Sequence, residues 1–417
     1  MKRMVWALVL MSCMSLVVMP AAAADYTLEI FGNANMDDEI DEDDITYVEG
    51  IIEGTNEVTL LADANFDSTI DEDDITQIEQ IIGGEEKELT IIDSANRTVT
   101  VKKPIKSLVV LTYPVVEATK IVEAEEKVVG VSNDIKSREK FFPELSKLPS
   151  VGVASAPDVE KIIDLNPDLV FTGRLLGVSD GLEDMPSDSI AVVRWDMGRL
   201  EMMTRNIKKL GYILDKEDSA EQFCDFYDEY VEETIKARIE IEEIPDDNRQ
   251  RVFIEHPVEY NTFVTGSGGH EVCVAAGGVN IAADFPSLSQ KPVVNVNPEW
   301  LVEQDPDVIV KTVTCTPGLC GCEANTSEEM ERLRESIMNR SGWSNLTAVK
   351  NRRVYLIDFD LVGSTANFVG ATYMAKWLYP EVFADLDPKA IHQEYLTRFQ
   401  RLDLDLDECG VFVCPAS

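Results

Sequence analysis

The clearest hydrophobic and polar pattern in the sequence is a helix–turn–strand unit that occurs twice. Residues 157–173, PDVEKIIDLNPDLVFTG, predict a short amphipathic helix, a tight turn at Asn-Pro-Asp and a buried apolar strand. Residues 297–312, NPEWLVEQDPDVIVKT, repeat this order around Asp-Pro-Asp. When the two turns are aligned, Glu160 superposes on Glu299, each in the first turn of its helix. The repeat predicts two α/β lobes with a cleft between them.

The segments around these units alternate between strands and helices in the same way. Apolar strands are predicted at 105–111 and 128–131, and a helix at 115–123. Strands that alternate with helices indicate a mostly parallel sheet. A long helix without glycine or proline is predicted over residues 216–243, between the two repeats.

An acidic segment ahead of the lobes carries a twelve-residue pattern twice, at residues 33–44 and 63–74. Each copy has oxygen-bearing side chains at positions 1, 3, 5, 9 and 12, and a helix with an apolar stripe follows. This spacing lets hard oxygens converge on one calcium ion, with a backbone carbonyl supplied by position 7. A disordered acidic segment would not explain two copies in register. The predicted Ca²⁺ ligands are Asn33, Asn35, Asp37, Glu39, Asp41, Asp44, Asp63, Asn65, Asp67, Thr69, Asp71 and Asp74.

The net charge of the chain limits which partners it can bind, and its first residues indicate where the protein is located. The 417-residue chain has a formal net charge of −40, which argues against nucleic acid and anionic membrane surfaces as partners. Lys2 and Arg3 precede an apolar run and a small-residue cleavage site, so residues 1–24 are predicted to be an export signal. Cys13 faintly matches a lipidation site, although the apolar run continues past it. We expect an exported protein that is extracellular, at the cell surface or in a periplasm-like space.

The paired loops resemble the type I dockerin, a small all-α calcium domain, over residues 30–84. Twelve-residue loops that end in aspartate and run into a helix carry the resemblance. Asp38 and Ser68 depart from it, because calcium loops usually have glycine at position 6. We expect this departure to weaken affinity, and extracellular calcium modules bind only at about 10⁻⁴–10⁻³ M. The resemblance implies a cohesin-like surface partner.

The rest of the chain resembles the substrate-binding proteins of ABC importers for iron complexes, haem and cobalamin. The segments KPIKSLVVL, KVVGVS, LPSVGV, DVEKIIDLNPDLVFTG and AAGGVNIAAD carry this resemblance, which spans residues 102–399. It implies an α/β fold of two Rossmann-like lobes joined by a long helix, here preceded by the small all-α calcium domain. The expected division is a signal peptide (1–24), a dockerin-like domain (25–84), a linker (85–88), lobe 1 (89–197), an inter-lobe helical region (198–247), lobe 2 (248–385), and a C-terminal helix and tail (386–417).

The implied function is binding and delivery without catalysis. The resemblance implies capture of an iron chelate or related metal macrocycle (siderophore, haem or cobalamin) and its delivery to an ABC permease dimer. In the family, one glutamate per lobe contacts the permease, and Glu160 and Glu299 occupy those places; the helix dipole also explains each one singly. The sequence contains no nucleophile elbow, phosphate loop or catalytic triad signature. The alternative is a dockerin-anchored cell-surface scaffold or adhesion protein whose lobes bind no transported ligand.

Ligand contacts are expected at the carboxyl ends of the strands, where open α/β sheets bind ligands. Aromatic rings suit flat, partly apolar ligands, arginine binds their carboxylates or phosphates, and histidine suits an iron or cobalt centre. An ordinary loop or core role explains each residue equally well. The candidates are Tyr113, Arg174, Trp195, Tyr260, His256 and His270.

The cysteines of an exported chain are interpreted first as disulfides. The segment 315–322, CTPGLCGC, has a cysteine spacing that matches no common zinc or iron–sulfur pattern. We therefore expect a disulfide-held loop after the strand at 308–311. An enzyme or metallochaperone that uses these thiols is a weaker alternative. Cys409 and Cys414 bracket four residues, a spacing that suits a second small disulfide loop.

Overall fold

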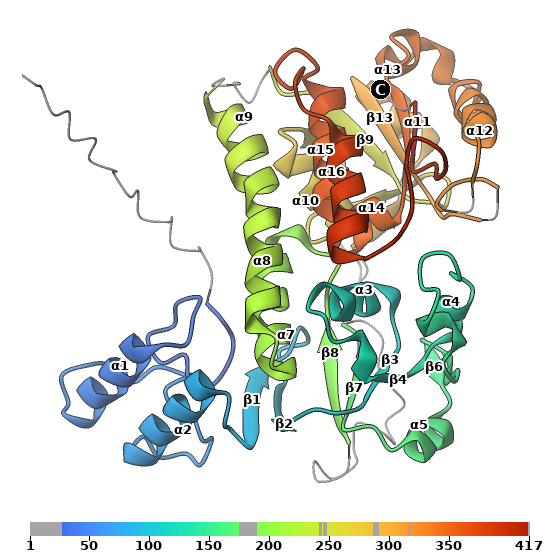
Figure 1. Cartoon of the computed structure of the whole chain (residues 1–417). Coiled ribbons are helices and arrows are strands. Elements are labelled where there is room, and N and C mark those ends of the chain that lie inside the picture. The colour runs from blue at the N-terminus through green and yellow to red at the C-terminus, as the bar shows by residue number, and fades with distance from the viewer. Residues whose placement is uncertain are drawn as a thin grey trace, which may run out of the picture.

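The computed structural model describes residues 27–174, 190–241, 244, 248–286, 292–316, 318–322 and 324–415. The predicted export signal and Cys13 lie outside these residues. Two α/β lobes stand one above the other, a long helix joins them along one side, and a small helical unit lies beside the lower lobe (Figure 1). None of the helices in these ranges is long and apolar enough to span a membrane.

Lobe 1 is built on a four-stranded parallel sheet with the order β4–β3–β7–β8. Its strands are mostly apolar, as expected for a parallel sheet that is covered on both faces, although Thr172 and Arg194 lie near the ends of β7 and β8. Leu108 and Val110 enter one core, whereas Val109 between them enters another. The elements of lobe 1 are β3 (Leu108–Val110), α3 (Tyr113–Ile121), β4 (Val128–Val131), α4 (Asn133–Lys136), β5 (Gly152–Val153), β6 (Ala156–Pro157), α5 (Val159–Leu165), β7 (Leu169–Gly173) and β8 (Ala191–Trp195).

The long helix between the lobes is present as predicted, with one irregularity. It runs from α8 (Glu217–Asp228) through a π-helical stretch (Glu229–Lys236) into α9 (Ala237–Ile241). Its apolar face packs against lobe 2, where the ring of Phe226 lies 5.6 Å from that of Phe368. The shorter α7 (Met203–Leu214) packs beside α8 at its lobe 1 end (Figure 1).

The sheet of lobe 2 is mixed, so the prediction of a mostly parallel sheet describes its centre and not its edges. The strands β11, β9, β13 and β14 are parallel, whereas β10, β12 and β15 pair antiparallel at the two sides. The elements of lobe 2 are β9 (Arg251–Glu255), β10 (Asn261–Phe263), α10 (Gly268–Ala275), β11 (Val279–Asn280), β12 (Val293–Asn295), α11 (Pro298–Gln304), β13 (Val308–Val313), α12 (Glu328–Met338), α13 (Thr347–Lys350), β14 (Val354–Asp358), α14 (Asp360–Gly363), α15 (Asn367–Leu378), α16 (Pro388–Glu394) and β15 (Val413–Cys414).

The N-terminal unit consists of the two predicted loops, each followed by a helix: α1 (Glu42–Ile52) and α2 (Glu72–Gly83). It leads into the antiparallel hairpin of β1 (Glu88–Ile92) and β2 (Thr98–Lys102). Segment 85–88, expected to be a linker, is held in place by a buried ion pair. Glu86 is 4% exposed and its carboxylate lies 2.6 Å from the buried ammonium of Lys103. The unit is therefore fixed to lobe 1.

Candidate functional site

The repeated helix–turn–strand unit has the same geometry in both lobes. α5 begins at Asp158, whose carboxylate accepts the N–H of Lys161 at 3.2 Å. α11 begins at Asn297, whose side-chain oxygen accepts the N–H of Glu299 at 2.8 Å. Glu160 and Glu299 are exposed in the first turns of these helices, where a helix N-terminus favours a carboxylate. Because α5 belongs to lobe 1 and α11 to lobe 2 (Figure 1), each lobe presents one glutamate in the first turn of the equivalent helix.

The turns that follow the two helices have the same backbone conformation and make equivalent hydrogen bonds. The helices end in left-handed residues, Asn166 at φ 47° and Asp305 at φ 42°, a conformation that Asn and Asp adopt more readily than most residues. Asp168 then accepts two backbone N–H groups just before β3, both at 2.8 Å. Asp307 accepts the N–H of Arg251, the first residue of β9, at 2.9 Å. The last residue of each turn therefore ties its unit to the neighbouring strand.

The lobes meet at a side-chain group centred on Arg138, which follows α4. The Arg138 guanidinium lies 4.0 Å from the centre of the Tyr113 ring and forms an ion pair with Asp360 of lobe 2. Nearby, Lys140 Nζ donates to the backbone oxygen of Cys322 in lobe 2 at 3.3 Å. A guanidinium stacked on a ring can exchange its carboxylate partner for an anionic group of a ligand. Tyr113 is thus one ligand candidate that lies between the lobes.

Two more carboxyl groups lie beside this pair. Glu117 on α3 is 2% exposed and accepts a hydrogen bond from Thr365 Oγ1 of lobe 2 at 2.8 Å. Asp358, the last residue of β14, is also 2% exposed. Burial, and secondly the charge of Asp360, raises the pKa of Glu117 to about 7 and that of Asp358 well above its usual range. Carboxyl groups from both lobes therefore surround Arg138, and some of them hold a proton near neutral pH.

The raised pKa of Glu117 predicts a pH-dependent stability. Between its ordinary value of 4.5 and about 7, the folded chain retains a proton that the unfolded chain releases. The stability that Glu117 contributes is therefore complete below pH 4.5 and is lost as pH rises to about 7, with a slope of up to about 1.4 kcal/mol per pH unit. Glu117→Gln should remove this slope. Urea unfolding of both proteins at several pH values tests it, and parallel profiles would contradict it.

His256 and His270 both lie in lobe 2 but in different surroundings. The His256 ring packs edge-on against Phe263 and Phe359, with centroid distances of 5.4 and 5.8 Å. The Nδ1 atom of His270 lies 3.2 Å from the side-chain amide of Asn280. Burial lowers the pKa of both imidazoles, which favours the neutral form that ligates metals.

Trp195, predicted to contact ligand, instead belongs to the core of lobe 1. Its side chain is 2% exposed, and its ring packs edge-on against Phe171 at 5.4 Å. Lys209 Nζ lies 5.7 Å from the centre of the indole ring. Successive residues of a strand face opposite sides of the sheet, and the last position of β8 faces inward. In this structure Trp195 is thus a core residue of lobe 1, and its contact with ligand stays a prediction.

Arg174 and Tyr260 also have partners inside their own lobes. Arg174 Nε donates to the carboxylate of Asp196 at 2.7 Å, which joins the ends of β7 and β8. Tyr260 has φ 57°, and its ring lies edge-on to Trp343 at 6.2 Å in a separate core cluster of lobe 2. The contacts of Arg174 and Tyr260 described above thus lie within their own lobes, and their ligand role stays a prediction.

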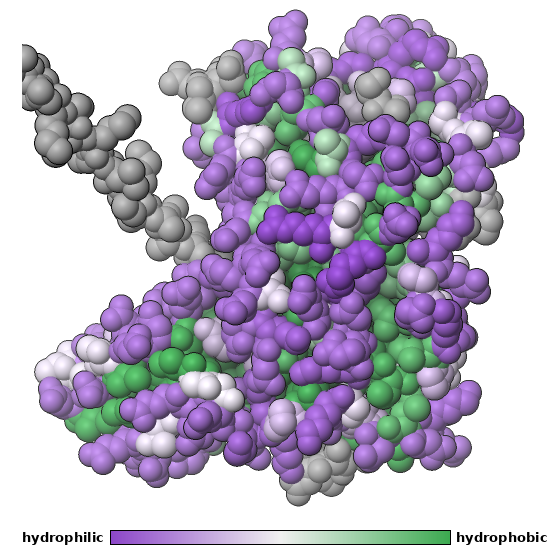
Figure 2. Space-filling model, in the orientation of Figure 1, coloured by the Kyte–Doolittle hydropathy of each residue, from purple (hydrophilic) through white to green (hydrophobic). Residues whose placement is uncertain are grey.

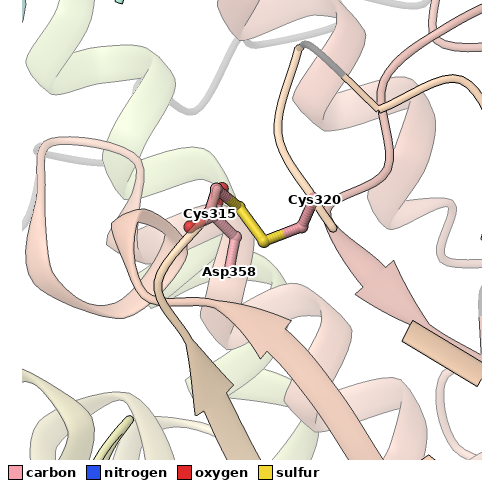
Figure 3. A group of neighbouring side chains, drawn as sticks. All are labelled: Cys315, Cys320 and Asp358. Atoms are coloured by element: carbon pink, nitrogen blue, oxygen red, sulfur yellow. A yellow bond between two sulfur atoms is a disulfide. The ribbon is translucent and has the colours of Figure 1, made fainter. Parts of the chain in front are cut away.

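The predicted disulfide-held loop after β13 is present. Cys315 and Cys320 are bonded, with their Cα atoms 4.7 Å apart, and a carboxylate oxygen of Asp358 lies within 4.8 Å of both sulfurs (Figure 3). Bonded sulfurs are not thiolates, so the metallochaperone alternative loses two of its proposed ligands in this state. The prediction of a second disulfide loop was wrong: Cys409 and Cys414 are free thiols, and Cys414 lies in the edge strand β15, where it pairs with Leu356 of β14.

Sequence reasoning missed most of the groups around Arg138. Asp358 and Asp360 carried a signal, because acidic residues directly after an apolar strand mark the ligand edge of a parallel sheet. Arg138 and Glu117 carried none. Arg138 follows a four-residue helix, and Glu117 lies on a helix whose buried side is decided by lobe 2.

Comparison with known proteins identifies the class to which this fold belongs. A model of the periplasmic binding protein family matches residues 108–361, more than half of the chain. The match begins after the N-terminal unit. Among solved structures, the TroA-like periplasmic binding protein FepB from Veillonella parvula has a TM-score of 0.63 at 25% identity, over 78% of this chain and 98% of that chain.

Three curated relatives agree with this class. The uncharacterized ABC transporter substrate-binding lipoprotein YvrC of Bacillus subtilis is 28% identical over 309 residues, 71% of this chain and 87% of the relative. The molybdate-binding protein MolA of Haemophilus influenzae is 24% identical over 355 residues, 77% of this chain and 93% of the relative. The vitamin B12-binding protein of Salmonella typhimurium is 26% identical over 181 residues, 42% of this chain and 64% of the relative.

These relatives are binding proteins and not enzymes, and their partners are a membrane permease and a small-molecule ligand. The family is extracytoplasmic, in agreement with the export signal expected from the sequence. The chain belongs to the periplasmic binding protein family, as the substrate-binding protein of an ABC transporter.

Proposed function

We propose that the protein captures a metal chelate or metal macrocycle, such as a ferric siderophore, haem or cobalamin, and delivers it to its permease. The observation that carries this proposal is the group of Arg138, Tyr113 and Asp360, which brings a ring, a guanidinium and a carboxylate to one place between the lobes. Ligands of this class combine apolar surface with carboxylates or phosphates, which suit a ring and a guanidinium. The vitamin B12-binding relative supports the class. The molybdate-binding relative makes an inorganic oxyanion the competing ligand.

Delivery is proposed to use Glu160 and Glu299. Both side chains are exposed, one on each lobe, so a permease dimer with a basic residue on each subunit can contact both at once. Charge pairs of this kind steer the encounter and set the orientation of the complex more than they add affinity.

Titration of the mature protein with candidate ligands tests this function. Cobalamin, cobinamide, haemin, several ferric siderophores and molybdate are added in turn while tryptophan fluorescence and binding heat are recorded. We expect saturable quenching by one class of coloured ligand at micromolar or tighter concentration. Energy transfer to a coloured ligand does not need contact, so the buried Trp195 remains a usable reporter.

The matched variants in this titration are Arg138→Ala and Arg332→Ala. Loss of a charge-assisted hydrogen bond costs about 1.5–3 kcal/mol, so Arg138→Ala should weaken binding by about tenfold or more. The Arg332 side chain is 63% exposed on α12, away from the Arg138 group, and its loss should have no effect. If molybdate is the one compound in the panel that gives binding heat, the ligand is an inorganic oxyanion. A protein that binds nothing in the panel would favour the surface-scaffold alternative.

A second proposed function belongs to the N-terminal unit, which we infer binds two calcium ions. The specific observation is Asn33, at position 1 of the first loop. It is 0% exposed, and its Oδ1 atom has no hydrogen-bond partner, although its amide donates to the carbonyl of Leu28 at 2.8 Å. A buried acceptor left unpaired costs about 1–3 kcal/mol, and a cation at the ligand position would satisfy it.

The position-12 carboxylates also fit calcium. Asp44 and Asp74 are both 0% exposed, and each is oriented by backbone N–H groups. In the first loop, the N–H groups of Asn35 and Asp41 donate to the two oxygens of Asp44, both at 3.0 Å. Two such carboxylates, buried without a basic side chain, are suited to a divalent cation. Calorimetric titration with Ca²⁺ tests the proposal, and two sites are expected.

A surface partner for this unit, of the cohesin kind, is proposed on the basis of its exposed apolar residues. Half of the large hydrophobic side chains that are exposed in the described ranges lie within residues 36–82, and Val58 and Leu60 are 69% and 63% exposed. Figure 2 shows apolar residues gathered on this unit. Exposed apolar patches often mark protein contacts. Docking there would hold the receptor near a cell surface.

A further inference from the structure

The first calcium loop is attached directly to lobe 1 by its backbone. The chain just before the loop joins the β1–β2 hairpin: the N–H of Phe31 donates to the carbonyl of Thr90 at 2.9 Å, and the N–H of Ile92 donates to the carbonyl of Glu29 at 3.0 Å. Through these two hydrogen bonds, residues 29–31 run alongside β1 as a short additional edge of the hairpin. The loop therefore begins at a fixed point on lobe 1.

Two residues inside the loop contact α7, the helix that packs beside α8 at its lobe 1 end. The carboxylate of Asp38 lies 2.8 Å from Lys208 Nζ, and the N–H of Ile40 donates to the Tyr212 hydroxyl at 3.2 Å. Asp38 is position 6, the place where the sequence departs from the usual glycine. Its carboxylate thus serves as an anchor to the lobe.

The same lysine reaches the helix between the lobes. Lys208 Nζ lies 3.6 Å from the carboxylate of Glu221 on α8, in addition to its contact with Asp38. Alongside, Lys209 Nζ lies 2.7 Å from the Glu29 carboxylate, and its side chain is 1% exposed. A chain of charge contacts therefore leads from the first loop through α7 to α8.

The second loop lacks this attachment in the described part of the chain. Ser68 stands at its position 6, is exposed and has φ 75°. The backbone N–H groups of Ser68 and Thr69 donate only to Asp63 and Asp67 of the same loop, at 3.0 and 2.9 Å. The two loops share a ligand pattern. They differ at position 6, where Asp38 contacts Lys208 of α7 and Ser68 bonds only within its own loop.

We propose that calcium in the first loop fastens the N-terminal unit to lobe 1, whereas the second loop binds calcium independently of the lobes. The reason is the place of Glu39. As position 7 it would offer its backbone carbonyl to the ion. Its two neighbours, Asp38 and Ile40, are the residues that contact α7. An ion that fixes this carbonyl also fixes the two contacts, and an empty loop whose carboxylates repel one another releases them.

This inference rests on the proposed calcium function and adds a reciprocal requirement. If calcium strengthens the contact with α7, then the contact must strengthen calcium binding in the first loop by the same factor. Removing Lys208 and the Tyr212 hydroxyl should therefore weaken one calcium site and spare the other.

Calorimetric titration of the mature, full-length protein with Ca²⁺ tests the inference. Asp67→Ala disables the second loop and isolates the first; Asp37→Ala does the reverse. On the Asp67→Ala background, Lys208→Ala combined with Tyr212→Phe should lower calcium affinity about fivefold or more. On the Asp37→Ala background, the same pair should change it less than twofold.

Amide hydrogen exchange provides a second readout. Adding a calcium chelator to the wild-type protein should speed exchange at the N–H groups of Phe31 and Ile40, which join the unit to the lobe. Calcium binding that is equally strong with and without Lys208 and Tyr212 would overturn the fastening. The absence of any calcium binding to the wild-type chain would overturn the calcium proposal itself, so the two failures are distinguishable.

Discussion

Replacing Glu160 and Glu299 together with alanine should reduce ligand uptake by about tenfold or more while leaving ligand affinity unchanged. Both side chains are exposed at the first turns of α5 and α11, away from the Arg138 group. Exposed charge pairs contribute about 0.2–1 kcal/mol each, so losing two reduces docking by up to about thirtyfold. Each single variant should reduce uptake about threefold. Uptake in cells carrying the cognate permease, together with ligand binding to the purified variants, provides the measurement.

The repeat supplies a matched control for this experiment. Asp164 and Glu303 occupy equivalent positions near the other ends of the same two helices, and both are exposed. Asp164→Ala combined with Glu303→Ala removes the same charge from the same elements, and uptake should remain near the wild-type rate. An equal loss in both double variants would show that overall charge matters and not the helix N-termini. Loss of ligand affinity in the Glu160 and Glu299 variant would remove the proposed permease role.

Glu255→Ala should destabilise lobe 2 by about 3–5 kcal/mol, because it leaves buried positive charge without its partner. The Glu255 carboxylate is 0% exposed and lies 2.8 Å from Arg340 and 3.2 Å from Lys311, two cations held at the end of β9. It also accepts the N–H of Tyr260 at 2.8 Å, which closes the loop that begins at His256. The variant should therefore unfold at a lower urea concentration and hold this loop less firmly.

Glu259→Ala is the control for Glu255→Ala. Glu259 contacts the same Arg340 at 3.3 Å, but its side chain is 69% exposed, so its loss should cost less than about 0.5 kcal/mol. Unfolding curves of the wild type and both variants, followed by circular dichroism at one pH, compare the two costs. Similar losses for the two variants would mean that burial of Glu255 does not set its contribution. A much larger loss of unfolding free energy in Glu255→Ala than in Glu259→Ala would support the stabilising role of the buried charge network.

Local chemistry in the sequence determined the repeated units and the two twelve-residue loops. A capping side chain, an Asn-Pro-Asp or Asp-Pro-Asp turn and an apolar strand act within about fifteen residues, so residues 157–173 and 297–312 adopt the predicted order. The same holds for α1 and α2, whose N-caps Asp41 and Asp71 form capping boxes with position 12 of each loop. The long helix also follows from local propensity, although its π-helical stretch had no sequence signal.

Tertiary structure alone decided which side chains meet between the lobes. Arg138 and Asp360 are 222 residues apart and face each other only because the lobes close on one another. Trp195 turned inward because of its place in β8, and Glu117 was buried by lobe 2. The contact between Asp38 and Lys208 likewise depends on how the N-terminal unit docks. Periodicity fixes which face of an element is apolar, whereas the partner of each polar side chain depends on packing between distant segments, which no local pattern encodes.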